Sequence, residues 1–284
     1  MRQQATFIPE LEAELDSFSC EEDISRLLLF RVLAIEYPHR TGGGSSPADA
    51  ANEIRNYLAA LSLAALSLRR KEISLIMIQR VHARLSGRAE PTPFRNHSVA
   101  VRPNILGARM RLTGTAPWNV FPRMEEMLDN IYRNPALSRF ERLAFGYFEL
   151  IRTHPFEDGN GRLSRLLLTA LIERAFRPGL ILTITRVMRS DFRRYHNAIR
   201  SQDDDVYARW LSYVGGAVRT EFYAARRFGT AFARLDRDDR NTALRIVGQA
   251  IRNFQRGAGS ATDFIFTSSD CSAKVGALLL GLMA

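Results

Sequence analysis

The middle of the chain contains the stretch HPFEDGNGRLSR, which occupies residues 154–165. Within twelve positions it combines an imidazole, acidic side chains, two glycines and two arginines. Apolar residues repeat at helical spacing both before and after it, so the stretch should form a corner that joins two helices. The sequence therefore predicts a fold in which two packed helices present one short, chemically rich loop.

The first residue of this stretch, His154, precedes Pro155. Proline disfavours helical geometry at the residue before it, so the preceding helix should end near Thr153 or His154. At such a helix exit the imidazole can reach a substrate, while burial of the Phe156 ring anchors the loop. No nearby serine or cysteine is paired with the histidine as a nucleophile. We therefore interpret His154 as a general base that takes a proton from an incoming hydroxyl.

The run Asp158-Gly159-Asn160-Gly161 follows directly. Glycines adopt backbone angles that are closed to other residues, so successive N–H groups can converge on one anion. The next helix begins at Gly161 or Arg162, and its free N–H groups and dipole point at the same place. This pattern predicts a cradle for a phosphate group.

Two arginines, Arg162 and Arg165, follow three positions apart and should share a helix face. Both can then bind one polyphosphate, and Asp158 is placed to bind magnesium, which prefers carboxylate, water and phosphate oxygens. Nucleotide-dependent group transfer is the chemistry that this combination indicates. The alternative is a tight turn between helices, with a capping Asp or Asn and a histidine that serves only packing.

The rest of the chain has mostly helical periodicity, which predicts an all-α fold. The expected helices cover residues 24–35, 50–68, 73–85, 120–132, 138–153, 163–176, 190–200 and 206–228. Alternating residues between positions 95 and 122 predict a small β-hairpin. Residues 237–256 are a candidate for one more helix, and residues 257–274 have the composition of a loose segment.

Composition predicts a soluble, cytoplasmic protein. The 284 residues are 46% hydrophobic, and neither a secretory signal nor an apolar run of membrane-spanning length is present. The net charge of +10 comes almost wholly from arginines spread along the chain, so a dedicated nucleic-acid surface is not favoured. Cys20 and Cys271 stand far apart and indicate neither a disulfide framework nor a zinc site.

The stretch 154–165 matches every specified position of His-Pro-Phe-x-Asp/Glu-Gly-Asn-Gly-Arg-x-x-Arg, the signature of the Fic family, which the chain therefore resembles. Weaker landmarks extend the resemblance over about residues 27–223, among them Pro93-Phe94-Arg95 and Trp210. The resemblance implies an α-helical Fic-type bundle with a β-hairpin flap. It also implies transfer of AMP from ATP to a Tyr, Thr or Ser hydroxyl of a target protein, with Mg2+ as the cofactor.

Roles carry over residue by residue. The resemblance makes His154 the base and groups it with Asn160 and Arg162 as the catalytic set, and it makes Asp158 the magnesium ligand. It implies that Tyr195 belongs to the adenine pocket. The nucleotide-binding residues that it implies are Gly159, Asn160 and Gly161 around the α-phosphate, Arg162 and Arg165 at the outer phosphates, and Tyr195.

The resemblance also suggests how the chain is divided. It implies an N-terminal helical region over residues 1–90, a core over 91–228 that contains the signature, and a helical or loose tail over 229–284. The flap is expected at about Arg109 to Trp118, where a protein substrate would dock by strand addition. A homodimer stays open as a further partner, and neither nucleic acid nor a membrane is expected.

Three departures from the family pattern are visible. Many relatives carry a Ser/Thr-x-x-x-Glu helix whose glutamate pairs with the second signature arginine and disturbs the outer phosphates. The best register places Arg40 at that glutamate, with Glu36 one turn earlier, so we expect a degenerate inhibitory helix near residues 36–40 and self-inhibition that is lost or supplied differently. Thr92 begins the segment that replaces the usual Pro-Gly-Glu-Phe-Arg, and Asp203 stands where an adenine-side asparagine is common.

Other functions compete with AMP transfer. Relatives that phosphorylate their targets carry lysine where Gly161 stands, and this glycine leaves room for phosphates beyond the α position. Removal of AMP from a modified protein would use the same site. A non-catalytic, transcription-linked binding module is the alternative from another class, although residues after Phe228 show no helix-turn-helix pattern.

Overall fold

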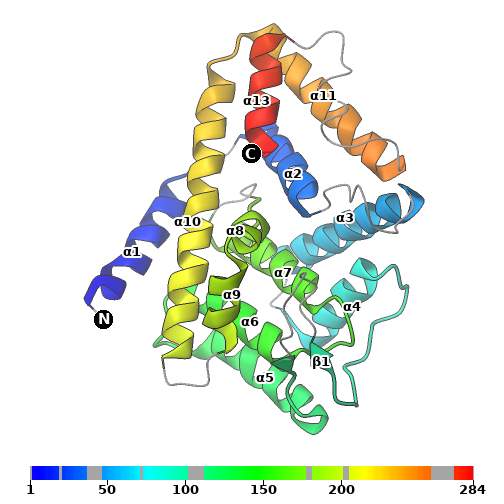
Figure 1. The fold of residues 1–284 in the computed structure, drawn as a ribbon, viewed down its shortest axis with the longest axis vertical. Helices are drawn as coiled ribbons and strands as arrows, with labels where there is room; N and C mark the ends of the chain where they lie inside the picture. Colours follow the sequence, from blue (N-terminus) through cyan, green and yellow to red (C-terminus); the bar gives the residue numbers. More distant parts are fainter. Residues whose placement is uncertain are drawn as a thin grey trace.

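The computed structural model describes residues 2–18, 21–36, 47–70, 73–101, 112–176, 181–200, 205–256 and 272–283 (Figure 1). Its described residues are almost entirely helical, which confirms the all-α class. The helices are α1 (Arg2–Ser17), α2 (Glu22–Glu36), α3 (Pro47–Arg70), α4 (Leu75–Leu85), α5 (Pro117–Arg133), α6 (Arg139–Thr153), α7 (Asn160–Ala175), α8 (Thr185–Ser190), α9 (Phe192–Arg200), α10 (Val206–Ala233), α11 (Arg237–Arg256) and α13 (Ala273–Met283). The strands are β1 (Ala100–Val101) and β2 (Leu112–Thr113).

Most helices lie where the apolar periodicity predicts them, and two differences have local causes. The helix expected over residues 190–200 begins two residues later, as α9 at Phe192, and Asp191 separates it from α8, which was not predicted. The Oδ1 of Asp191 accepts a hydrogen bond from the backbone N–H of Arg194 at 3.1 Å and so caps the start of α9. Helix α1 was not predicted, and it is held by Leu11 and Leu15, both fully buried.

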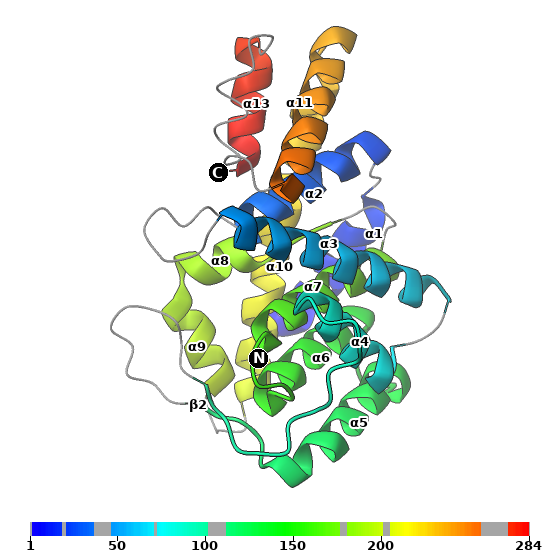
Figure 2. The same cartoon turned by 90° about the vertical axis from the view of Figure 1, so that its right-hand side faces the viewer.

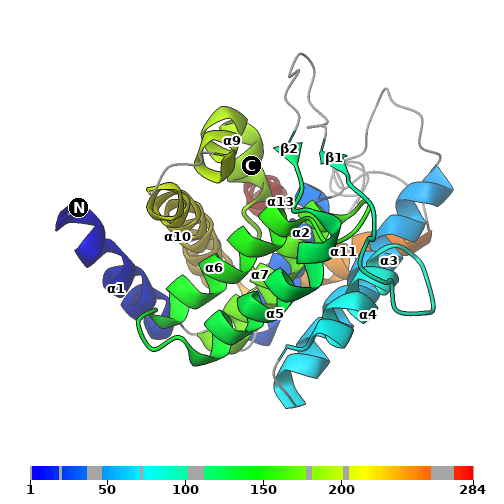
Figure 3. The ribbon, with the colours of Figure 1, turned by 90° about the horizontal axis from the view of Figure 1, so that it is seen from below.

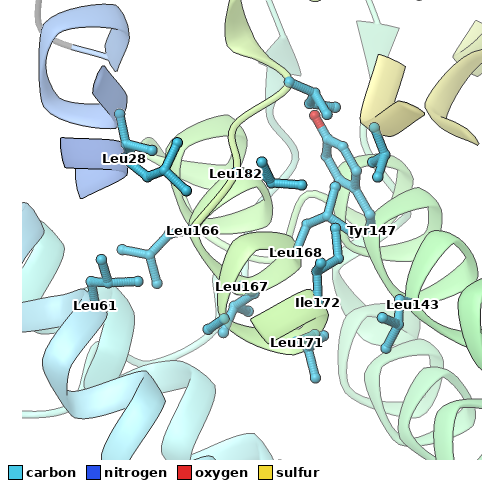
Figure 4. Packing of buried hydrophobic residues seen from close by; sticks show 14 of the residues in the cluster. Leu28, Leu61, Leu143, Tyr147, Leu166, Leu167, Leu168, Leu171, Ile172 and Leu182 are labelled. Atoms are coloured by element: carbon cyan, nitrogen blue, oxygen red, sulfur yellow. The ribbon is translucent and has the colours of Figure 1, made fainter. Parts of the chain in front are cut away.

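Helix α7 is the centre of the core (Figure 4). Its leucines face several neighbours at once: Leu166 lies toward Leu61 of α3 and Leu28 of α2, while Leu168 lies toward Tyr147 of α6. A helix that is apolar around most of its surface has to be enclosed by other elements. The start of α7, and with it the signature loop, is therefore fixed by packing on several sides.

Helices α6 and α7 pack against each other and are joined by the signature loop. Ser138 and Glu141 form a capping box at the start of α6, with Ser138 N donating to Glu141 Oε2 at 2.7 Å. Farther along α6, the indole Nε1 of Trp210 in α10 donates to the backbone oxygen of Ala144 at 2.9 Å. The helix that leads to His154 is thus fastened both at its start and in its middle.

Helices α11 and α13 lie beside α2 at one end of the molecule (Figure 2). Arg31 of α2 connects them to the core, since its guanidinium pairs with buried Glu221 of α10 at 2.8 Å and donates to the backbone oxygen of Leu282 in α13. Arg186 of α8 pairs with the other oxygen of Glu221 at 3.0 Å. Helix α2 is therefore held in one position relative to α8, α10 and α13.

The two short strands pair antiparallel and lie side by side in Figure 3. Ala100 is opposite Thr113, and Val101 is opposite Leu112. These strands fall within the two arms of the predicted hairpin, but residues 102–111, which would join them, lie outside the described residues, so the hairpin flap stays a prediction. Trp118, the expected end of the flap, belongs to α5 instead. Among the described helices, none is both long enough and apolar enough to cross a membrane.

Candidate active site

His154 stands at the end of α6, as predicted. It has φ of 51°, the only positive φ of a non-glycine residue in the described part of the chain, and its N–H donates to Leu150 O at 3.1 Å. Burial lowers the pKa of His154 from 6.5 to about 4, and a hydrogen bond to the Ile151 backbone opposes that shift. The imidazole is therefore neutral at physiological pH and free to accept a proton.

The loop is closed by a clamp between Asn160 and Phe156. Asn160 Oδ1 accepts from Phe156 N at 3.0 Å, and Asn160 Nδ2 donates to Phe156 O at 2.8 Å. The Phe156 ring is buried, as expected for the anchor of the loop. Both polar atoms of the Asn160 side chain are used in these two hydrogen bonds. In this structure the side chain therefore fixes the shape of the loop.

Gly159 has φ of 80°, a conformation that strains any residue with a Cβ. A Cβ added here would also lie 3.1 Å from Nε2 of His82. The backbone at Gly159 thus turns sharply just before the first turn of α7, which is the local geometry predicted for the cradle.

His82 of α4 packs against this turn. Its ring stacks on Phe156 with centroids 3.8 Å apart, and its Nε2 donates to the backbone oxygen of Asp158 at 2.9 Å. His82 therefore has a packing role against the signature loop. No signal in the sequence placed His82 against the signature loop, because α4 and the loop are joined only through tertiary packing.

The two signature arginines do not converge in this structure. Arg162 Nη2 is 3.7 Å from Asp158 Oδ2, and its Nη1 is 3.9 Å from Glu53 Oε1 in α3. These are long, partly exposed contacts, so the guanidinium of Arg162 can be redirected at small cost. The carboxylate of Asp158 is 97% exposed and is available to bind a cation.

Arg165 is occupied by Glu36, the last residue of α2. Arg165 Nε lies 3.2 Å from both carboxylate oxygens of Glu36, and Nη2 lies 3.1 Å from Oε2. Thr183 and Thr185 donate their hydroxyls to Oε1 of the same carboxylate, Thr183 at 2.6 Å. The expected register, which places Arg40 at the inhibitory glutamate, is wrong: Glu36, one turn earlier, supplies the carboxylate that pairs with Arg165. Arg40 itself lies outside the described residues.

The electrostatics of this pair follow from its burial. Desolvation disfavours the charged form of Glu36, but the charge and hydrogen bonds of Arg165 outweigh it and hold the pKa of Glu36 below its usual 4.5. The Glu36 carboxylate in turn raises the pKa of Arg165. Both groups are therefore charged over the physiological range, and neither can be removed without leaving the other uncompensated.

Tyr195 of α9 lies in an aromatic cluster with Tyr147, Trp210 and Tyr213. Its ring is 7% exposed, and its hydroxyl is 3.5 Å from the hydroxyl of Tyr147. Its predicted place in an adenine pocket stays a prediction, and Asp203 lies outside the described residues. Thr92 is buried, with its hydroxyl unpartnered among the described residues.

Metal binding at Asp158 would depend on ligands from outside the protein. The described residues contain no group of three His, Cys, Asp or Glu side chains that could hold a metal ion together. A magnesium ion held by one exposed carboxylate takes its other ligands from phosphate and water, and such a site fits the donor set of this loop.

Comparisons by family model, by sequence and by structure all find similarity to Fic proteins. The model of the Fic/DOC family matches residues 72–172. A protein adenylyltransferase fic-1 from Caenorhabditis briggsae is 33% identical over 129 residues, which is 44% of this chain and 24% of that protein. A protein adenylyltransferase Fic from Drosophila willistoni is 31% identical over 162 residues, 56% of this chain and 30% of that protein. This chain thus spans less than a third of the length of either relative.

Among solved structures, a Fic family protein from Desulfovibrio desulfuricans G20 has a TM-score of 0.62. It is 17% identical in sequence and covers 90% of this chain, which covers 84% of it. At that identity the likeness establishes the fold, which extends well beyond the segment matched by the family model.

Proposed function

Since this chain contains a Fic/DOC domain over residues 72–172, we propose that it is a protein adenylyltransferase. It transfers AMP from ATP to a Tyr, Thr or Ser hydroxyl of a target protein. The observation that carries the proposal is the corner between α6 and α7. There a neutral imidazole lies in the same short loop as a glycine turn and a helix N-terminus, the arrangement that commonly binds phosphate. The names of the relatives support the same activity.

The reaction assigns one task to each group. His154 takes the proton of the target hydroxyl at an imidazole nitrogen as the hydroxyl oxygen bonds to the α-phosphorus. The bond from the α-phosphorus to the oxygen that bridges it to the β-phosphate breaks, and pyrophosphate leaves. Negative charge on the bound triphosphate favours the imidazolium, and this strengthens a base whose pKa is lowered by burial.

Charge on the nucleotide is stabilised by the start of α7. Its free N–H groups, beginning after Gly159, point toward the α-phosphate, and Arg162 can turn from Asp158 to the outer phosphates. A magnesium ion bound through Asp158 would neutralise part of the phosphate charge. Asn160 acts by keeping the loop in the shape that this binding needs.

Gly161 favours nucleotidyl transfer over phosphorylation. A Cβ at this position would lie 3.3 Å from Nη1 of Arg165. A lysine here, as in relatives that phosphorylate, would bring a second cation against that guanidinium. The glycine instead leaves the space beside Arg165 for phosphates beyond the α position.

Glu36 makes the described state an inhibited one. Its carboxylate occupies Arg165, one of the two arginines proposed to bind the outer phosphates. ATP can still enter the loop, but its outer phosphates then lack one cation and face a carboxylate. We expect AMP transfer to rise when Glu36 leaves this position.

The test uses magnesium and ATP labelled at either the α or the γ phosphate, incubated with the Glu36→Gly variant and cell lysate. Label on protein from α but not from γ is the expected result, and Glu36→Gly/His154→Ala should give none. Label from γ alone would identify a phosphotransferase. No label from either position would contradict a group-transfer function and favour a binding role.

A further inference from the structure

Arg95 lies between the signature loop and the short β-ladder, and its side chain is 5% exposed. Its guanidinium donates to four backbone oxygens: Nε to His154 O at 2.6 Å, Nη2 to Thr153 O at 3.0 Å and Thr115 O at 2.5 Å, and Nη1 to His97 O at 2.8 Å. Its backbone N–H donates to Pro155 O at 2.9 Å. One residue therefore holds the last carbonyls of α6 and the segments on both sides of the ladder.

The direction of these bonds explains why a buried cation is tolerated here. The carbonyls of Thr153 and His154 belong to the end of α6, where the helix dipole places negative partial charge. Burial lowers the pKa of Arg95, and the hydrogen bonds of its guanidinium go to backbone oxygens. Losing the guanidinium would leave those oxygens buried without donors.

The strand segment also touches both residues directly. A Cβ added at Gly114, which follows β2, would lie 2.8 Å from Nη2 of Arg95 and 3.3 Å from Cβ of His154. Gly114 N donates to Val99 O at 3.4 Å and so extends the ladder toward the loop. The end of the ladder, Arg95 and His154 thus form one contiguous contact.

His154 needs such support because its own backbone is strained. Its φ of 51° lies in the left-handed region, which L-residues other than glycine rarely adopt. A bond from Arg95 to its carbonyl fixes the orientation of the peptide that follows the imidazole. The same guanidinium fixes Thr115, so the base and the ladder cannot shift independently.

On the basis of the function proposed above, we propose that Arg95 is a positioning residue. It sets the direction of the His154 imidazole relative to the β1–β2 ladder, so that the base meets a target hydroxyl presented along that ladder. Arg95 acts through His154 and Thr115, and within the described part of the chain none of its hydrogen bonds goes to the turn at Gly159 or to the first turn of α7.

Lysine cannot replace this arrangement. A planar guanidinium presents five N–H donors in fixed directions, whereas an ammonium is a compact charge with three donors. Arg95→Lys therefore keeps the charge beside His154 but loses most of the geometry. The Arg95→Lys variant therefore distinguishes a positioning role of the guanidinium from an effect of its positive charge on His154.

The kinetic test compares Arg95→Lys with its parent, both carrying Glu36→Gly. We expect kcat for AMP transfer to fall by about 10- to 100-fold, since displacement of a reacting group by about 1 Å costs up to about 100-fold. The KM for ATP should stay unchanged. Arg139→Lys is the matched control, because Arg139 also donates to a helix-terminal carbonyl, Ala175 O at 3.1 Å, yet stands at the other end of α6. It should retain the parent rate.

A readout without turnover completes the test. In the Arg95→Ala variant, kept well below its melting temperature, the NMR titration of the His154 imidazole should move upward from about 4, because burial and the Arg95 charge both hold it down. In Arg95→Lys the imidazole resonance should shift while the titration midpoint moves less. Parent-like kcat in Arg95→Lys, or an unchanged His154 titration in Arg95→Ala, would overturn the proposal. An inactive Glu36→Gly parent would instead count against AMP transfer itself.

Discussion

Glu36 binds Arg165 through both carboxylate oxygens, and so joins the end of α2 to the first turns of α7. The side chains are 3% and 12% exposed, respectively, so the pair is shielded from water. Such a pair has little net value for stability, yet breaking it from one side leaves a buried charge. Under the proposed function, the outer phosphates of ATP would replace this carboxylate at Arg165, so the ion pair would compete with nucleotide binding.

The first prediction concerns thermal stability. Glu36→Gly should lower the melting temperature, because Arg165 loses its counter-charge at a cost of about 3–5 kcal/mol. Magnesium and ATP should then restore much of the loss, since a ligand that binds only the folded state stabilises it. The same nucleotide should raise the melting temperature of the wild-type chain far less.

Glu22→Gly is the control for this experiment. Glu22 lies on the same helix but is 81% exposed and pairs with Arg26 on the surface, so its loss should change neither the melting temperature strongly nor the response to ATP. If ATP raised the melting temperature of wild type and of Glu36→Gly equally, the Glu36 carboxylate would not obstruct the nucleotide.

The second prediction is a pH dependence of the ion pair. The folded-state pKa of Glu36 is depressed below 4.5, so the unfolded chain binds its proton first as the pH falls. The stability that wild type has over Glu36→Gln should therefore be constant above pH 4.5 and diminish as the pH falls further. Urea unfolding at a series of pH values measures this difference, and a difference that grew toward acid pH would contradict it.

The third prediction concerns His154. Its pKa of about 4, against 6.5 in an unfolded chain, means that the unfolded state takes up the proton first between these values. The group therefore lowers stability as the pH falls from 6.5 to 4 and has no such effect above 6.5. NMR titration of the imidazole should have its midpoint near 4. A His154 midpoint near 6.5 would refute the burial argument.

The fourth prediction addresses the clamp inside the loop. Asn160→Ala removes both hydrogen bonds to the Phe156 backbone and leaves buried groups unpaired, at a cost of about 1–3 kcal/mol. AMP transfer should fall by about tenfold or more in the Glu36→Gly background. Asn130→Ala removes one bond to Glu126 O and one from Asn134 Nδ2, both outside the signature loop, so it should lower stability less than Asn160→Ala and leave AMP transfer unchanged. Identical melting curves for the two alanine variants would argue against the clamp.

Local features were predicted well because their causes are local. Pro155 ends α6 at Thr153, and the glycine at position 159 permits the turn into α7. The helical pattern around them reflects a core in which α7 is enclosed, and that pattern is readable from apolar spacing alone.

The partner of Arg165 could not be predicted in the same way. Glu36 and Arg165 are 129 positions apart, and which carboxylate reaches the guanidinium depends on how α2 is seated. That seating comes from Arg31 and Glu221, a buried pair between α2 and α10 that no local pattern reveals. The same holds for His82, whose contact with the loop exists only because α4 packs against α7.

The most direct measurement of the central claim is the rate at which the α-phosphate label of ATP enters protein. It is taken for the wild-type chain, Glu36→Gly, and Glu36→Gly with His154→Ala, all with magnesium. The account predicts that Glu36→Gly exceeds wild type by at least about tenfold, a difference of about 1.4 kcal/mol in the barrier, and that the double variant incorporates none. Equal rates in Glu36→Gly and the double variant, or no incorporation by any of the three, would contradict it.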